Sequence, residues 1–465
     1  MESYLGKEKE YRSSNRKGAE KKQQNGKKDT RVADCKPVIL AGQRGGLLPV
    51  QRLVGFEAEL SVPVYRPISG EYLTLKRDIR QPPDGVKTFL FGDVSHNLQL
   101  KHTKHFTLTT DHGELLVYQQ QIFDELVKHN YISEDIAGMY CNCGILEYVT
   151  PAEDESRIWG RHLMKGHMAN IMKDGGRALG KVRDCMVPLE GNTMTGVPFA
   201  DFRQWMGDDY EIIRDLLDRF AEIATSDYIN LQATAGIFPS QMRALVNANA
   251  PETITEENVM NFSNIQLKAA LIGITQYINE FQDEPYIKSL GGNLDSFLGI
   301  IQVLYLYMIG EAINCTVLNR SSPKNCVAFQ VKLSNMHDMI SKAAPSLAEN
   351  RPDPDFAARS YDFLASQRSA TKEWWAEKYG AEEKSPEQHI MSRESFINIL
   401  LGHGDLEVIA SGHTFEEPDT TAGKLGRSQH GIQMEYRNIR GVSLSNLAEV
   451  SEGIMEQVRR VNLED

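Results

Sequence analysis

Residues 55–60 read Gly-Phe-Glu-Ala-Glu-Leu, in which apolar and acidic side chains alternate. Such alternation indicates a β-strand with one apolar and one polar face. In a β-strand successive side chains point to opposite faces, so Glu57 and Glu59 would share one face and the apolar residues the other. Two carboxylates about 7 Å apart along a strand repel each other unless a cation lies between them. Such a pair is a natural ligand set for Mg²⁺, although an ordinary strand with a solvated polar face would show the same hexapeptide.

Three later segments, 143–150, 228–237 and 431–441, repeat this pattern of an apolar face opposite a polar one. If the four strands share a sheet, several carboxylates and an arginine converge on one surface. Four carboxylates cannot all stay ionised there without cations, so two or three divalent ions are expected. Metals together with arginine are what a nucleoside triphosphate needs. The polar residues of these later segments are Glu147, Gln232, Thr234, Glu435 and Arg437.

Helical spacing of apolar residues separates the predicted strands and indicates an α+β fold. Helices are expected in most of 240–430, including 330–342 and 356–405, with an exposed loop at 349–355. The apolar run at 297–310 is too short to span a membrane and is expected to be a buried core helix. We therefore expect one domain over 35–465 with long helical insertions. Shorter helices are predicted at 119–129, 153–173, 208–225 and 443–462, and a further strand at 104–110.

Residues 1–34 hold seven Lys and three Arg against six acids, and few apolar residues. Such a segment cannot bury enough surface to offset its ordering entropy, so a disordered basic tail is expected. It fits either a solubilising tail or a leader that a transport or packaging partner binds. No apolar signal-peptide core is present, which favours a cytoplasmic protein, with secretion by a specialised machine as the alternative.

The chain carries a formal net charge of −12, which argues against a general nucleic-acid binder and leaves room for a local phosphate pocket. Six cysteines in 465 residues are sparse, so we expect reduced thiols rather than a disulfide framework. The composition indicates a chain without nucleic-acid or membrane partners.

The order of the polar strands resembles that of carboxylate–amine ligases with the glutamine-synthetase fold, closest to the amidoligases and the relatives of glutamate–cysteine ligase. The resemblance spans about residues 50–442, and only short islands carry it. It implies an antiparallel sheet of the glutamine-synthetase type, with a concave active-site face and helices that back and extend it. The islands are Gly-Phe-Glu-Ala-Glu at 55–59, Asp-His-Gly at 111–113, Gly-Ile-Leu-Glu-Tyr-Val-Thr-Pro at 144–151, Leu-Gln-Ala-Thr-Ala-Gly at 231–236 and Gln-Met-Glu-Tyr-Arg at 433–437.

The resemblance implies that ATP phosphorylates a carboxylate and that an amine then displaces the phosphate to form an amide. The expected cofactors are ATP and two or three Mg²⁺ ions, with Mn²⁺ as a substitute. The expected substrates are a small-molecule or peptide carboxylate and amine. The expected metal ligands are Glu57, Glu59, Glu147 and Glu435, the catalytic residues Asp111 and Arg437, and the nucleotide contacts Gln232, Arg243, Arg320 and Arg440.

Two other functions fit the same residues. One is an ATP-dependent phosphoryl transferase, since guanidino kinases share the fold that the resemblance implies. The other is a non-catalytic metal-binding interaction protein. Asp111 likewise has two interpretations, as a group that binds or deprotonates the amine and as a turn-capping aspartate. With the basic tail, the ligase could also be an effector that acts on a foreign molecule.

Overall fold

The computed structural model groups Leu48–Asp465 as one compact unit. Within the chain it describes 53–67, 91–92, 94, 97–134, 143–182, 187–188, 194–195, 199–250, 252, 262–313, 329–330, 345–379, 392–402, 432–439 and 441–463. The predicted tail at 1–34 lies outside the described residues.

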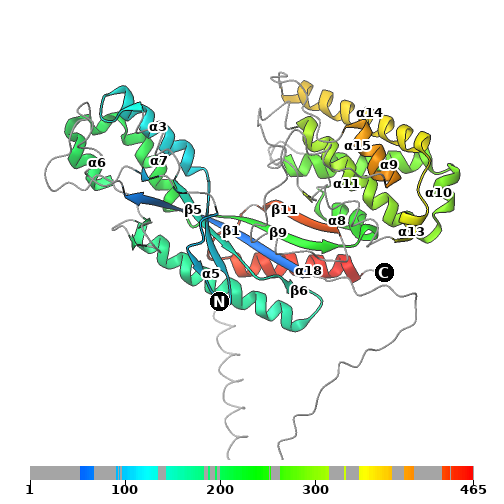
Figure 1. Cartoon of the computed structure of the whole chain (residues 1–465), viewed down its shortest axis with the longest axis horizontal. Coiled ribbons are helices and arrows are strands. Elements are labelled where there is room, and N and C mark those ends of the chain that lie inside the picture. Colours follow the sequence, from blue (N-terminus) through cyan, green and yellow to red (C-terminus); the bar gives the residue numbers. More distant parts are fainter. Residues whose placement is uncertain are drawn as a thin grey trace, which may run out of the picture. The chain divides into compact units, whose positions relative to one another are not determined.

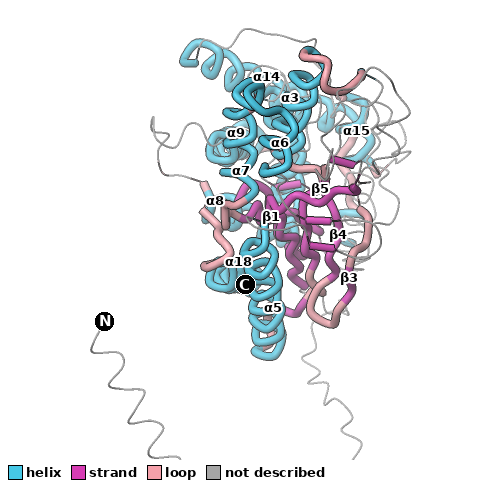
Figure 2. Tube along the Cα trace, turned by 90° about the vertical axis from the view of Figure 1, so that its left-hand side faces the viewer, coloured by secondary structure: helices cyan, strands magenta, loops and turns pink. Residues whose placement is uncertain are grey.

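An antiparallel sheet forms the centre of the fold, with the strand order β10-β11-β9-β1-β5-β4-β3 (Figure 1). The short strands β2, β6 and β8 also pair with β1, and β7 pairs with β8. Figure 2 shows β4 and β3 following β5 at one edge of the sheet. The strands are β1 (Leu53–Pro67), β2 (Phe91–Gly92), β3 (Lys101–His102), β4 (Thr107–Asp111), β5 (Gly144–Val149), β6 (Glu153–Asp154), β7 (Val187–Pro188), β8 (Met194–Thr195), β9 (Ile229–Ile237), β10 (Phe329–Gln330) and β11 (Ile432–Ile439).

The four strands that the sequence marks as polar on one face are neighbours, in the order β5, β1, β9 and β11. The prediction that they share one antiparallel sheet is therefore confirmed, as is the α+β class. The finer assignment to the glutamine-synthetase type stays a prediction.

Helices cover the apolar face of this sheet. Phe56, Leu60 and Tyr148 are buried on that face, and α5 (Ile158–Val182) and α18 (Leu447–Leu463) pack beneath it (Figure 1). A Cβ at Gly175 of α5 would lie 3.2 Å from the Leu60 side chain. The Tyr148 hydroxyl donates to Asp174 of α5 over 3.4 Å. The alternation in β1 and β5 thus sets which face is packed and which stays polar.

The second half of the chain adds a helical group in which α11 packs against α8, α9 and α14. Nearly every side chain of α11 from Phe297 to Ile309 is buried, which confirms the predicted core helix there. The helices not yet named are α3 (Leu115–Lys128), α6 (Phe199–Met206), η1 (Gly207–Ile212), α7 (Arg214–Ala224), η2 (Pro239–Gln241), α8 (Met242–Asn249), α9 (Phe262–Phe281), α10 (Pro285–Ser289), η3 (Gly291–Asn293), α11 (Leu294–Ile313), α13 (Pro345–Glu349), α14 (Pro354–Tyr379) and α15 (Arg393–Leu401).

Several predicted boundaries are wrong. The helix expected from residue 153 begins at Ile158, because Glu153 and Asp154 first pair with β1 as β6. The segment 208–225 divides into a 3₁₀-helix and α7, and residue 330 belongs to β10 instead of a helix. That helix is predicted at 330–342, and its remaining residues, 331–342, lie outside the described ones.

Within the described part of the chain, no helix is both long and apolar enough to cross a membrane. The described cysteine, Cys143, is a buried free thiol, and its burial raises its pKa to about 12.

Candidate active site

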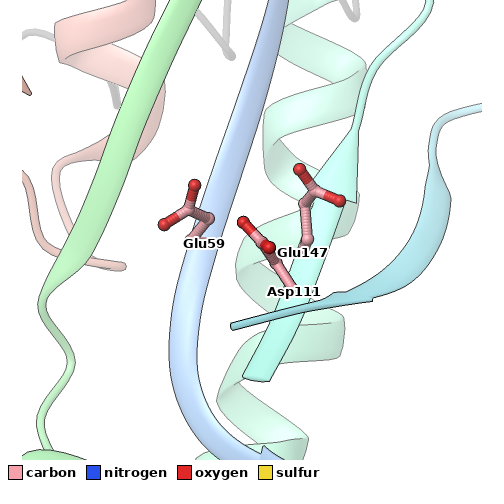
Figure 3. A group of neighbouring side chains, drawn as sticks. All are labelled: Glu59, Asp111 and Glu147. Atoms are coloured by element: carbon pink, nitrogen blue, oxygen red, sulfur yellow. The ribbon is translucent and has the colours of Figure 1, made fainter. Parts of the chain in front are cut away.

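Three carboxylates gather on the polar face of the sheet, from Glu59 on β1, Asp111 at the end of β4 and Glu147 on β5. One carboxylate oxygen from each residue lies within 4.8 Å of the others. Figure 3 shows the three side chains on neighbouring ribbons, with the Asp111 carboxylate between those of Glu59 and Glu147. We refer to Glu59, Asp111 and Glu147 as the carboxylate triad.

The strand register explains why residues so far apart in sequence meet. Glu59 lies directly opposite Glu147 in the β1–β5 pairing, and Glu147 lies opposite Thr109 in the β5–β4 pairing. Asp111 follows Thr109 by two residues, so it points to the same face. A shift of one residue in either pairing would send one of these carboxylates to the apolar face.

Two side-chain amides of β9 hold the carboxylate of Glu59. Asn230 Nδ2 donates to Glu59 Oε2, and Gln232 Nε2 donates to Glu59 Oε1, each over 2.7 Å. Glu59 and Gln232 are each 9% exposed. Because each Glu59 oxygen accepts one of these neutral donors, the carboxylate is fixed in orientation.

The other two carboxylates are oriented by Thr109 of β4 and by His112, which follows β4. Thr109 Oγ1 donates to Glu147 Oε2 over 2.6 Å. Asp111 Oδ1 accepts the backbone N–H of the next residue, His112, over 2.7 Å. Asp111 is half-buried, whereas Glu147 is 9% exposed, so the triad meets solvent on the Asp111 side.

The donor set and its spacing fit a hard divalent cation. Like charges this close are stabilised by a cation or by a shared proton. Oxygens on opposite sides of Mg²⁺ lie about 4.2 Å apart and those around Ca²⁺ about 4.8 Å apart, from metal–oxygen distances of about 2.1 and 2.4 Å. Only one pair among three ligands can lie on opposite sides of an ion, so the triad oxygens would move inward to bind one.

A further acceptor lies beside the triad. The Oε1 atom of Gln232 is buried and has no hydrogen-bond partner among the described residues. An orphaned amide oxygen next to a carboxylate cluster is costly unless a cation or a donor binds it. Its chemistry is that of a hard-metal ligand, so it also fits the divalent ion that the resemblance implies.

The structure brings the predicted ligands Glu59 and Glu147 together, and adds Asp111, which the sequence suggested for amine binding instead. Glu57 lies on the same face, two residues from Glu59 and opposite Gln232 in the β1–β9 pairing, and its side chain is half-buried. Glu435 is the register partner of Thr234 in the β9–β11 pairing. Residues 435 and 437 both belong to β11, whose side chains at 432–438 lie outside the described ones.

The other predicted nucleotide contacts are Arg243, Arg320 and Arg440. Arg243 lies in α8, and its guanidinium forms a half-exposed ion pair with Asp295 of α11 over 3.3 Å. The predicted contacts Arg320 and Arg440 lie outside the described residues.

Sequence reasoning missed the two residues that orient the triad through hydrogen bonds, Asn230 and Thr109. Asn230 carried a usable signal, because it lies at an alternating position of a strand already identified as polar on one face, whereas Thr109 lies in a strand predicted without such a face. What the sequence lacked was the register that brings each beside its carboxylate.

No protein-family model matches the chain, and no curated protein matches it by sequence. One solved structure aligns with 86% of this chain and 98% of its own, at 9% sequence identity and a TM-score of 0.30. It is described as a mutant ACD domain of a VgrG toxin from Vibrio cholerae, in complex with ADP and Mn²⁺. A likeness this slight carries no conclusion about this chain, whose candidate site is argued from its own residues.

Proposed function

We propose that the chain is an ATP- and divalent-metal-dependent ligase that joins a carboxylate to an amine. The observation that carries the proposal is the carboxylate triad, with its oxygens within 4.8 Å of one another on three adjacent strands. The islands that resemble carboxylate–amine ligases contain all three triad residues, at 59, 111 and 147. Pattern and geometry therefore support the same site.

The residues of the chain would contribute binding and orientation. Glu59, Asp111 and Glu147 would hold a divalent ion, with Mg²⁺ or Mn²⁺ as the candidates, which would supply positive charge for the phosphates of ATP. Gln232 would offer its Oε1 atom as a further oxygen ligand while its Nε2 atom keeps Glu59 in place. The half-buried Asp111 would be the ligand nearest to incoming substrate.

A hydroxylamine trap tests the ligation because hydroxylamine replaces whichever amine the enzyme uses. An acyl phosphate reacts with hydroxylamine to give a hydroxamate, which iron(III) reveals by colour. The purified chain would be incubated with ATP, Mg²⁺, hydroxylamine and a panel of amino acids, dicarboxylates and peptides. We expect hydroxamate and ADP in equal amounts, with both lost in EDTA and in Glu147→Gln.

Glu114→Gln serves as the matched control, because Glu114 is an exposed glutamate that follows β4 in the chain and is not a member of the triad. It should leave turnover unchanged. Phosphorylated acceptor without hydroxamate would instead favour the phosphoryl transferase. Metal binding by the triad with no ATP turnover on any member of the panel would contradict the ligase and favour a non-catalytic metal protein.

A further inference from the structure

Helix α5 carries an unusual concentration of exposed apolar side chains at its N-terminal end. Ile158 and Trp159 are 76% and 75% exposed, and Leu163 is 49% exposed. They are three of the seven large apolar side chains classed as exposed among the described residues, and they fall within six positions of one helix. Clustered exposed apolar surface of this kind marks a binding surface more often than scattered single residues do.

The same helix is basic although the chain as a whole is acidic. Between Ile158 and Val182 it carries five Lys or Arg and one Asp, against a formal net charge of −12 for the chain. Lys173, Arg177 and Lys181 are spaced by four residues and exposed, so they form one row along the helix. Basic residues in the last turn of a helix complement the helix dipole. This row begins more than two turns before the end of α5, so the dipole alone does not account for it.

The apolar and basic groups share the outer side of α5. The inner side holds Met164, Met168 and Ile171, which are buried against the rest of the fold. At 100° per residue, the exposed apolar and basic residues all fall on the half of the helix opposite this buried stripe. We call the exposed set Ile158, Trp159, Leu163, Lys173, Arg177 and Lys181 the α5 outer face. The sheet lies between this face and the carboxylate triad, because α5 packs on the apolar side of β1.

The chemistry of this face matches an anionic lipid surface. Tryptophan and aliphatic side chains at one end of a helix enter the boundary between head groups and acyl chains, while a row of Lys and Arg binds anionic head groups. Trp favours this interface in particular, and the long stems of Lys and Arg let them follow it. The outer side of a single helix also presents these groups to a flat surface, as a bilayer requires.

Contrary to the expectation from composition, we propose that the α5 outer face docks the protein onto a bilayer that contains anionic phospholipid. The helix lies in the plane of the membrane, with Trp159 and its apolar neighbours inserted and the basic row on the head groups. The carboxylate triad, on the opposite face of the sheet, stays open to the aqueous side.

Vesicle co-sedimentation of the full-length chain tests this. Vesicles of phosphatidylcholine with about 30% phosphatidylserine should bind the protein at least about tenfold more tightly than phosphatidylcholine alone, and about 0.5 M NaCl should weaken the binding. Lys173→Glu/Arg177→Glu should reduce binding about tenfold or more because it reverses the basic row. Trp159→Ser/Leu163→Ser should reduce it similarly and should remove any blue shift of Trp fluorescence on vesicle addition.

The controls match each change elsewhere on the surface. Lys128→Glu/Arg219→Glu reverses two charges that are 65% and 67% exposed on α3 and α7. Val117→Ser removes an apolar side chain that is 55% exposed on α3. Both should bind vesicles like the wild type, and circular dichroism should show that all variants fold.

Two results would overturn the proposal. One is binding to the anionic vesicles that is unchanged in both α5 variants, since another part of the chain would then carry it. The other is absence of vesicle binding. If α5-dependent binding then appeared with poly-glutamate, the α5 outer face would be assigned to an acidic protein partner instead.

Discussion

Glu59 on β1 and Glu147 on β5 are direct cross-strand partners, so two carboxylates face each other in the middle of the sheet. Like charges in this position destabilise an antiparallel pair. Neutral donors on the outer sides of the pair offset part of this cost, from Asn230 and Gln232 on one side and Thr109 on the other. The two carboxylates are thus held in fixed orientations next to each other, as the proposed metal site requires.

Neutralising one triad member should have opposite effects with and without metal. In EDTA, Glu59→Gln or Glu147→Gln should raise the thermal unfolding midpoint, because it relieves like-charge repulsion. In Mn²⁺ or Mg²⁺ the wild type should gain stability, by about 2.7 kcal/mol at a metal concentration of about 100 times Kd, and the variants should gain much less. Differential scanning calorimetry measures both effects. An equal metal-induced shift in wild type and variants would contradict the assignment of the triad as a metal site.

Removing an orienting amide should weaken metal binding without abolishing it. Gln232→Leu and Asn230→Leu each delete a 2.7 Å donor to Glu59, and loss of such outer contacts costs about 10- to 100-fold in metal affinity. Mn²⁺ titration followed by electron paramagnetic resonance gives the affinities. Gln232→Leu should be the more damaging, because it also removes the orphaned Oε1 atom. Equal affinities in the two variants would argue against Oε1 as a ligand.

The packing of α11 against η2 requires a close approach of their two backbones. A Cβ at Gly299 of α11 would lie 1.8 Å from the carbonyl oxygen of Pro239 in η2, so α11 could not keep its position. Gly299→Ala should therefore destabilise the fold by about 1–3 kcal/mol. Gly180→Ala is the matched control: no atom lies within 4 Å of its Cβ position, and the change should stabilise α5 by about 1 kcal/mol. Urea unfolding midpoints compare the two, and equal effects would show that α11 does not need this approach.

A pH-dependent contribution should come from two histidines near the edge of the sheet. His105 Nδ1 lies 3.2 Å from His167 Nδ1, and His167 Nε2 lies 3.0 Å from Glu153 Oε1. Desolvation, with the nearby His167 and Lys104, lowers the pKa of His105 from its ordinary value. The folded state therefore favours neutral His105. Its contribution to stability is complete above the unfolded pKa of about 6.5 and is lost as the pH falls through the lower folded pKa.

The variant His105→Gln keeps a side-chain donor for His167 but does not titrate. Between about pH 7.5 and 5.5 its free energy of unfolding should fall less than that of the wild type. His162→Gln, which changes an exposed histidine of α5, should follow the wild-type curve. A His105→Gln curve parallel to the wild type would show that His105 does not carry this dependence.

The alternation of apolar and polar residues predicted much of the architecture. It identified Phe56, Ala58 and Leu60 as a packed face, and all three are buried. It also predicted four strands that prove to be neighbours in one sheet. Element ends were less predictable, because β6 pairs with the start of β1 through a contact that local spacing does not encode.

The sequence by itself determined which residues are acidic and which strand face each one occupies, because a two-residue period depends only on the order of side chains. Only the tertiary structure decided which acids meet. Register across β4, β5 and β1 brings Asp111 to Glu59 and Glu147, and places Asn230, Gln232 and Thr109 where they orient the cluster. Register is set by pairing between distant segments, with Gln232 and Glu59 separated by 173 residues, and no local pattern specifies such a pairing.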